Sequence, residues 1–229
     1  VIHMLGEGSG STNNAHYVQQ FRKTLREENA EAYVLGEHFN EATRWLQGDQ
    51  EDGAMNYYGF AHPVREWLAG TDIAYEPAKL DTTEFSAWLD SARGRIPYAN
   101  QLTQFNLLDS HDTARFFTLV GGDTDAMKLA VSLLFAYPGV PSIYYGDEIG
   151  LEGRDYPEPR RCFNWEDTHW NHELFEHYRG AITLHKTREE LRHGAYETLK
   201  AERDDFAFAR FTDRTASVHV FNRSKQAST

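Results

Sequence analysis

The sequence predicts an α/β fold, in which helices cover a parallel sheet and a small antiparallel unit follows near the carboxyl end. Residues 33–35 form an apolar run of the kind found in strands that are buried on both faces. Segments with apolar residues at helical spacing precede and follow this run, so strands and helices alternate along the chain. After residue 194 apolar and polar residues alternate, which favours antiparallel strands.

The first predicted helix begins at Asn13 or Asn14, either of which can cap its amino end, and it ends near Asn29. Its apolar face is expected to contain Ala15, Val18, Phe21 and Leu25. The preceding residues 6–11 are rich in glycine and superficially resemble a dinucleotide-binding fingerprint. Ser11 stands where that fingerprint needs its third glycine, so a flexible loop is the better interpretation.

Further strands and helices are predicted in the same rhythm. A short helix contains Ala42, Trp45 and Leu46, and residues 54–57 form a second strand. The next helix contains Val64, Trp67 and Leu68. The helix after it starts at Asp81, which forms a capping box with Glu84 and precedes Phe85, Trp88 and Leu89 in helical register.

The second half of the chain continues with a third strand over residues 103–108. A helix over residues 126–136 is apolar nearly all round, which indicates a buried helix. Residues 138–150 contain a fourth strand that enters a turn flanked by glycines. An amphipathic helix begins near His172.

Composition excludes several classes of protein. The chain has 229 residues, of which 40% are hydrophobic, so one or two domains with a sizeable core are expected. Its net charge of -12 opposes binding to nucleic acid or to an anionic membrane surface. The apolar run at 129–136 is too short to span a membrane. The single cysteine, Cys162, cannot form an internal disulfide, and we expect a reducing, cytoplasmic environment.

Two segments resemble metal sites and are assigned to ordinary structure. Residues 48–53 are acidic but lack the spacing of an EF-hand, so a solvated loop is expected. His172 and His177 are five residues apart, whereas a zinc helix needs four to place both rings on one face. Their imidazoles are expected to face solvent, and no metal or cofactor is predicted.

The candidate catalytic residues stand where predicted strands end. Glu37 follows the strand at 33–35, and His111 and Asp112 follow the third strand. Because the carboxyl ends of parallel strands meet at one edge of a sheet, we expect these side chains to converge. The alternative to a catalytic role is a structural one, in which Glu37 is a loop carboxylate that caps the next helix. Ser110, His111 and Asp112 are not interpreted as a hydrolase triad, because neighbours on a strand point to opposite faces and the G-x-S-x-G elbow is absent.

Several motifs together resemble the α-amylase family of glycoside hydrolases. They are Gly36-Glu37, then His111-Asp112, then the run Tyr-Tyr-Gly-Asp-Glu-Ile-Gly at 144–150. The segment 154–165 is similar to the branch that contains neopullulanases, cyclomaltodextrinases and, with the greatest likeness, bacterial maltodextrin glucosidases. The resemblance covers essentially the whole chain.

The resemblance implies a fold and a set of roles. Residues 1–193 would form the carboxyl-terminal half of a (β/α)8 TIM barrel, strands five to eight, and residues 194–229 would begin an antiparallel β-sandwich domain. Glu37 would be the general acid/base, His111 would bind sugar hydroxyls and Asp112 would stabilise the transition state. The nucleophilic aspartate of the family would immediately precede Val1. Ser110 departs from the Asn of many family members and fits the neopullulanase-like branch.

The implied activity is retaining hydrolysis of α-1,4-glucosidic bonds in short maltodextrins, carried by an intact parent enzyme. Cyclomaltodextrinase or neopullulanase activity is the first alternative. A non-catalytic barrel that serves in carbohydrate binding or assembly is the second. The expected partners are an α-glucan oligosaccharide, the missing amino-terminal half of the barrel and a second copy of the chain, with neither nucleic acid nor membrane among them.

Overall fold

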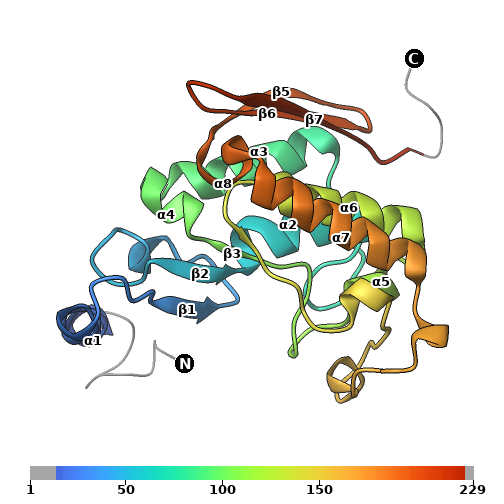
Figure 1. Cartoon of the computed structure of the whole chain (residues 1–229), viewed down its shortest axis with the longest axis horizontal. Helices are drawn as coiled ribbons and strands as arrows, with labels where there is room; N and C mark the ends of the chain where they lie inside the picture. Colours follow the sequence, from blue (N-terminus) through green and yellow to red (C-terminus); the bar gives the residue numbers. More distant parts are fainter. Residues whose placement is uncertain (1–13, 225–229) are drawn as a thin grey trace.

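The computed structural model describes residues 14–224, with a four-stranded and a three-stranded sheet joined by helices (Figure 1). The strands are β1 Leu35–His38, β2 Gly53–Asn56, β3 Phe105–Asn106, β4 Val140–Pro141, β5 Ala195–Glu202, β6 Asp205–Phe211 and β7 Ala216–Asn222. The α-helices are α1 Asn14–Glu28, α2 His62–Val64, α3 Thr82–Gly94, α4 Tyr98–Leu102, α5 Phe116–Leu119, α6 Thr124–Ala136, α7 His172–Thr187 and α8 Glu189–His193. Shorter turns of helix are η2 Thr43–Trp45, η3 Tyr57–Ala61, η4 Arg65–Ala69, η5 Asp147–Ile149, η6 Glu158–Arg160 and η7 Asp167–His169.

The first sheet is parallel, and its strands lie in sequence order, β1-β2-β3-β4. Glu37 in β1 is level with Met55 in β2, and Met55 is level with Phe105 in β3. All four strands therefore end at the same edge. Parallel neighbours need a crossover, and helical segments between consecutive strands supply it.

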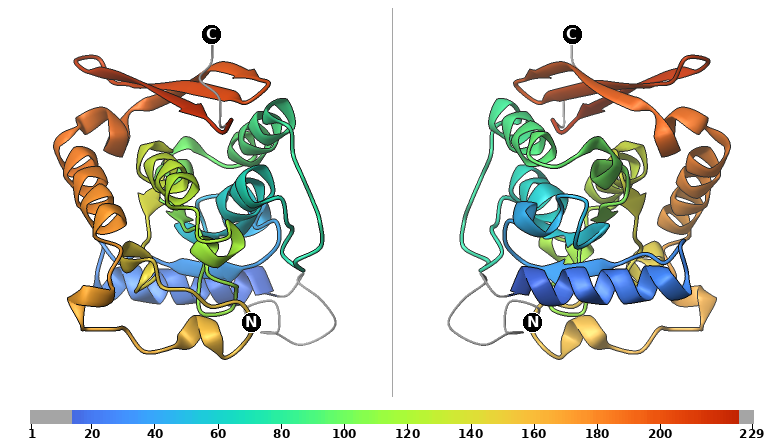
Figure 2. Two further views of the ribbon diagram at one scale, coloured as in Figure 1. Left: turned by 90° about the vertical axis from the view of Figure 1, so that its right-hand side faces the viewer. Right: turned by 90° about the vertical axis from the view of Figure 1, so that its left-hand side faces the viewer.

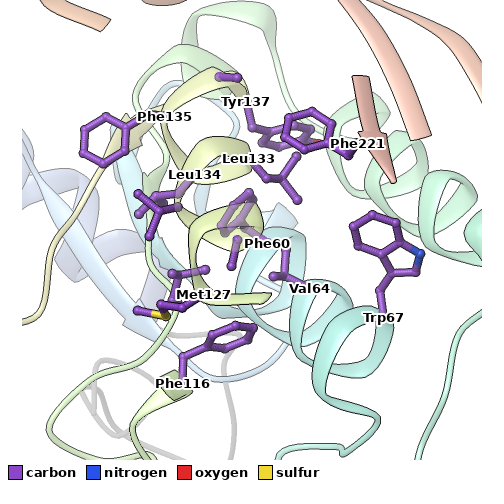
Figure 3. Packing of buried hydrophobic residues seen from close by; sticks show 14 of the residues in the cluster. Phe60, Val64, Trp67, Phe116, Met127, Leu133, Leu134, Phe135, Tyr137 and Phe221 are labelled. Atoms are coloured by element: carbon purple, nitrogen blue, oxygen red, sulfur yellow. The ribbon is translucent and has the colours of Figure 1, made fainter. Parts of the chain in front are cut away.

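The main core lies between the helices rather than inside the parallel sheet. Its side chains come from the continuous helical stretch η3–α2–η4, from α3, from α6 and from the second sheet, as Figure 3 shows for Phe60, Val64, Leu133, Leu134 and Phe221. The predicted capping box is present at the start of α3, where Asp81 accepts from the Glu84 N–H and the Glu84 carboxylate accepts from the Asp81 N–H. The apolar helix α6 is buried along most of its length, as predicted.

The second sheet is antiparallel, in the order β5-β6-β7, and lies across the helices on the side away from α1 (Figure 2). Phe206 in β6 contacts the stacked rings of Trp67 and Phe85, at centroid distances of 6.2 and 5.1 Å. Arg210, fully buried, donates to the carbonyl oxygens of Ala136 and Gly194. These contacts attach the sheet to η4, α3 and α6.

The first strand differs from its prediction. It begins at Leu35, and its residues are alternately exposed and buried, whereas burial on both faces was expected. Leu35 and Glu37 lie on the open face, while Gly36 and His38 pack against the loop that precedes β2. Tyr33 is also exposed and donates from its hydroxyl to the Thr103 carbonyl. The apolar run is therefore buried on only one side of the chain.

The helix prediction near residue 172 was correct, but one of its two histidines is not solvent-facing. His172 is exposed, whereas His177 is half-buried, with its Nε2 2.9 Å from Ser132 Oγ and 3.1 Å from the Lys128 carbonyl.

The third and fourth strands are shorter than predicted. The glycine-rich segment at 6–11 lies outside the described residues. Within the part of the chain that the structure describes, no helix is long and apolar enough to cross a bilayer.

Candidate active site

Glu37 is presented by the alternation of β1. Successive side chains on a strand point to opposite faces, so burial of Gly36 and His38 sends Glu37 to the open face. The carboxylate is exposed there, one residue from the carboxyl end of the strand. The interpretation of Glu37 as a helix-capping residue is not supported, because η2 begins only at Thr43 and the Thr43 N–H bonds to Glu41.

His111 and Asp112 lie in a tight turn after β3. The Ser110 N–H donates to Thr113 Oγ1 and the Thr113 N–H donates to the Ser110 carbonyl, which closes the turn. His111 Nε2 is 3.3 Å from Asp112 Oδ2, so these neighbours do contact each other, contrary to the prediction made from strand geometry. Ser110 is buried and its Oγ accepts from the Asp112 N–H and from Tyr57, which leaves it a structural role.

The structure brings these candidate residues together. One carboxylate oxygen each of Glu37 and Asp112 and one ring nitrogen of His111 all lie within 4.8 Å of one another. Glu37 and Asp112 are far apart in sequence, and the ends of β1 and β3 place their carboxylates on one surface. Two carboxylates and an imidazole at this separation can act on the same small polar ligand.

Arg160 completes the cluster from the loop after β4. Its guanidinium donates to Asp112 Oδ1 at 2.5 Å and to the carbonyl oxygen of His111 at 2.9 Å. The planar guanidinium fork thus fixes both the backbone and the carboxylate of the turn. The ion pair is partly open to solvent, with side-chain exposures of 43% for Arg160 and 34% for Asp112.

Tyr57 connects the residues that follow β1 with the turn that follows β3. Its ring stacks on Phe39, two residues after Glu37, with centroids 4.4 Å apart, and its hydroxyl donates to Ser110 Oγ at 2.7 Å. Burial raises the pKa of Tyr57 to about 12, and the charges of Glu37 and Asp112 add to the rise. The phenol therefore keeps its proton at neutral pH and remains the donor that joins the two loops.

Comparison with known proteins identifies the family of this chain. The family model described as Alpha amylase, catalytic domain matches residues 8–194. The chain belongs to the α-amylase family. It is therefore a member of a family of glycoside hydrolases with a TIM-barrel-type catalytic domain, here with a parallel and an antiparallel sheet.

Relatives in this family carry related names. A cyclomaltodextrinase from Bacillus sp is 38% identical over 213 residues, covering 92% of this chain and 37% of the relative. Neopullulanase 2 from Thermoactinomyces vulgaris is 36% identical, covering 91% of this chain and 35% of the relative. The native Nostoc punctiforme debranching enzyme superposes with a TM-score of 0.87 at 37% identity, over 93% of this chain and 45% of that chain. The chain thus spans about a third of the length of the curated relatives it matches.

A buried network lies behind the candidate site of this α-amylase family chain and supports it. Arg115 is fully buried and donates to the Tyr145 carbonyl, to Asp147 Oδ1 and to the carbonyl of Pro159, the residue before Arg160. Its guanidinium also faces the Tyr144 ring at 4.1 Å. One side chain from the β3 turn thereby fixes the loop that carries Arg160.

Asp109 and Asp147 form a buried carboxyl pair in this network. Burial raises the pKa of Asp147 well above its usual range, and the nearby charge of Asp109 adds to the rise. Asp109 accepts from the Phe116 N–H through Oδ2, while its buried Oδ1 finds no N–H or hydroxyl donor among the described residues. The two carboxyl groups hydrogen-bond to each other, and burial and the charge of Asp109 favour a proton on Asp147 over a second buried charge.

We expect Asp147→Asn to flatten the pH dependence of stability. A folded-state pKa above the unfolded value gives stabilisation that is complete below the unfolded pKa and is lost as the pH rises through the folded pKa. Asn supplies a permanent N–H donor in place of the shared proton. Thermal melting from about pH 5 to about pH 9 should therefore show a smaller decline for Asp147→Asn than for the wild type. Exposed Asp213→Asn is the control, and an equal decline in all three proteins would contradict the shared proton.

The cluster does not favour a metal ion. Glu37, His111 and Asp112 could offer one ligand atom each. However, the guanidinium of Arg160 already occupies Asp112 Oδ1 and would repel a cation at the same place. A neutral ligand rich in hydroxyl groups meets no such repulsion.

Two parts of the site were not predicted from the sequence. Arg160 lies in the segment 154–165, whose sequence indicated a branch of the family but no role for this side chain. The loop at 48–53, expected to be solvated, buries Gln50 and Glu51, and Glu51 is fully inaccessible beneath β1. This difference arises because Gly36 leaves room for a carboxylate against the strand, which acidic composition alone does not indicate.

Proposed function

We propose that this chain supplies the acid/base and the transition-state-stabilising carboxylate of a retaining glycoside hydrolase that cleaves α-1,4-glucosidic bonds in short maltodextrins. The observation that supports it best is the convergence of Glu37, His111 and Asp112 within 4.8 Å on an open surface. Because the chain corresponds to about a third of its curated relatives, the activity is proposed for the longer protein that contains it.

Each side chain has a role in this proposal. Glu37 protonates the leaving glycosidic oxygen and later deprotonates the attacking water. Asp112, oriented by Arg160, stabilises the positive charge that develops on the sugar ring. His111 binds a sugar hydroxyl beside Asp112. A retaining mechanism also needs a nucleophile, a second carboxyl group about 5–5.5 Å from the acid.

A second candidate is cyclomaltodextrinase or neopullulanase activity. It is favoured by the names of the relatives that are 38% and 36% identical to this chain. Both candidates use the same chemistry at the cleaved bond and differ in the shape of the substrate around it.

Substrate comparison tests these candidates. The full-length protein is incubated separately with maltotriose, cyclomaltoheptaose and pullulan, and initial rates and product anomers are measured. We expect maltotriose to be hydrolysed fastest, with retention of the α-anomer, because retaining chemistry proceeds through two inversions. Faster hydrolysis of the cyclic substrate or of pullulan would favour the second candidate. Binding of all three without hydrolysis would instead indicate a carbohydrate-binding barrel.

A further inference from the structure

Glu51 is a fully buried carboxylate directly behind the strand that carries Glu37. Its two oxygens lie 3.0 and 2.9 Å from Nε2 of His38, which is itself only 8% exposed. The His38 ring stacks on Trp45, with centroids 4.3 Å apart and planes inclined by 21°. The imidazole is thus held on one face by an indole and at its edge by a carboxylate.

The same carboxylate also contacts the other neighbour of Glu37. The Glu51 side chain fills the space beside Gly36 so closely that a Cβ on residue 36 would overlap its carboxyl carbon and both oxygens. Gly36 and His38 are the residues immediately before and after Glu37. Glu51 therefore fixes both flanking residues from the face of β1 opposite to the candidate acid.

The main chain of Glu51 is anchored independently of its side chain. Its N–H donates to the carbonyl oxygen of Trp45, and its own carbonyl accepts from the side-chain amide of Asn100 in α4. The carboxylate therefore projects from a fixed point toward β1. Burying an ionisable pair costs desolvation that an apolar pair would avoid, so its use here calls for a geometric explanation.

We infer that Glu51 and His38 form a positioning pair for Glu37. This inference rests on the proposed function of Glu37 as the general acid/base. The pair fixes the backbone position and twist of β1 on either side of Glu37. It therefore sets the direction in which the Glu37 carboxyl group points. General acid catalysis depends on this direction, because displacement by about 1 Å can cost roughly a hundredfold in rate.

The test is the isosteric substitution Glu51→Gln in the full-length protein. Gln keeps one oxygen that can accept from His38 Nε2, but it lacks the negative charge and the second oxygen that face the imidazole. We expect kcat/KM on maltotriose to fall by roughly ten- to a hundredfold. On α-glucosyl fluoride, whose leaving group needs little protonation, kcat/KM should stay within about twofold of the wild-type value.

Asp52→Asn is the matched control. Asp52 is the next residue in the same loop, but its carboxylate pairs with Arg22 and Arg26 of α1 and accepts from the Val34 N–H. This variant should lower stability and change kcat/KM for both substrates in equal proportion. Equal losses on both substrates in Glu51→Gln, or no loss on either, would overturn the positioning role. Inactivity of the wild type on both substrates would instead overturn the proposed function itself.

A second pair of variants tests the positioning role of Glu51 and His38 if Glu51→Gln fails to fold. His38→Gln keeps an N–H donor for the Glu51 carboxylate, whereas His38→Leu removes it at similar volume. The expected result is that His38→Gln retains most of the maltotriose activity and that His38→Leu loses it selectively, with α-glucosyl fluoride spared. Similar behaviour of the two variants on maltotriose would overturn the inference.

Discussion

Replacing Glu37 by Gln should lower kcat/KM of the full-length protein on maltotriose by roughly 10²–10⁴, the largest loss expected from any single change in the described site. Gln has the same shape but cannot donate a proton to the departing sugar. On α-glucosyl fluoride the first step should be nearly unaffected, because fluoride leaves without a strong acid. Steady-state kinetics on the two substrates, with Glu41→Gln as a nearby carboxylate control, measure this difference.

The contrast between the two substrates is what identifies an acid. A loss of equal size on maltotriose and on α-glucosyl fluoride would assign Glu37 to binding or to folding. Full activity of Glu37→Gln on maltotriose would remove it from the reaction altogether.

Replacing Asp112 by Asn should lower turnover by about 10²–10³ on both substrates. Asp112 has no proton to give in the proposed mechanism, and its negative charge is opposite the positive charge that develops on the ring. That charge develops whichever group leaves, so α-glucosyl fluoride should not be spared. The geometry of the turn should survive, because the Asn side chain can still accept from Arg160 and the main chain still bonds to Ser110 Oγ.

Arg160→Gln separates charge stabilisation from loop geometry. Partly exposed ion pairs contribute about 0–1 kcal/mol, so this variant should lose far less activity than Asp112→Asn. A loss as large as that of Asp112→Asn would show that the loop contact, rather than the Asp112 charge, carries the effect. Sparing of α-glucosyl fluoride by Asp112→Asn would also contradict the assigned role.

Local patterns in the sequence predicted the elements that local interactions specify. The capping box at Asp81 and Glu84, the buried helix α6 and the parallel order of the strands all follow from short-range signals or from general rules of topology. The position of Glu37 at a strand end was predicted for the same reason. The convergence with Asp112 was expected from the rule that parallel strands end at one edge.

The errors arose where contacts between distant segments decide the outcome. Leu35 is apolar yet exposed, because nothing in the described part of the chain covers that face of β1. His111 and Asp112 touch because they lie in a tight turn rather than on a strand, which periodicity does not reveal. Glu51 is buried because of Gly36 and His38, which precede it by more than ten residues.

The weakness of the contact between Arg160 and Asp112 has a consequence for ligand exchange. A deeply buried pair is costly to break, whereas both side chains of this pair are partly exposed to solvent. In the proposed function, sugar hydroxyl groups can therefore compete with the guanidinium for Asp112 in the resting enzyme at little energetic cost. The resting chain thus holds Asp112 in a defined orientation with a partner that it can readily release.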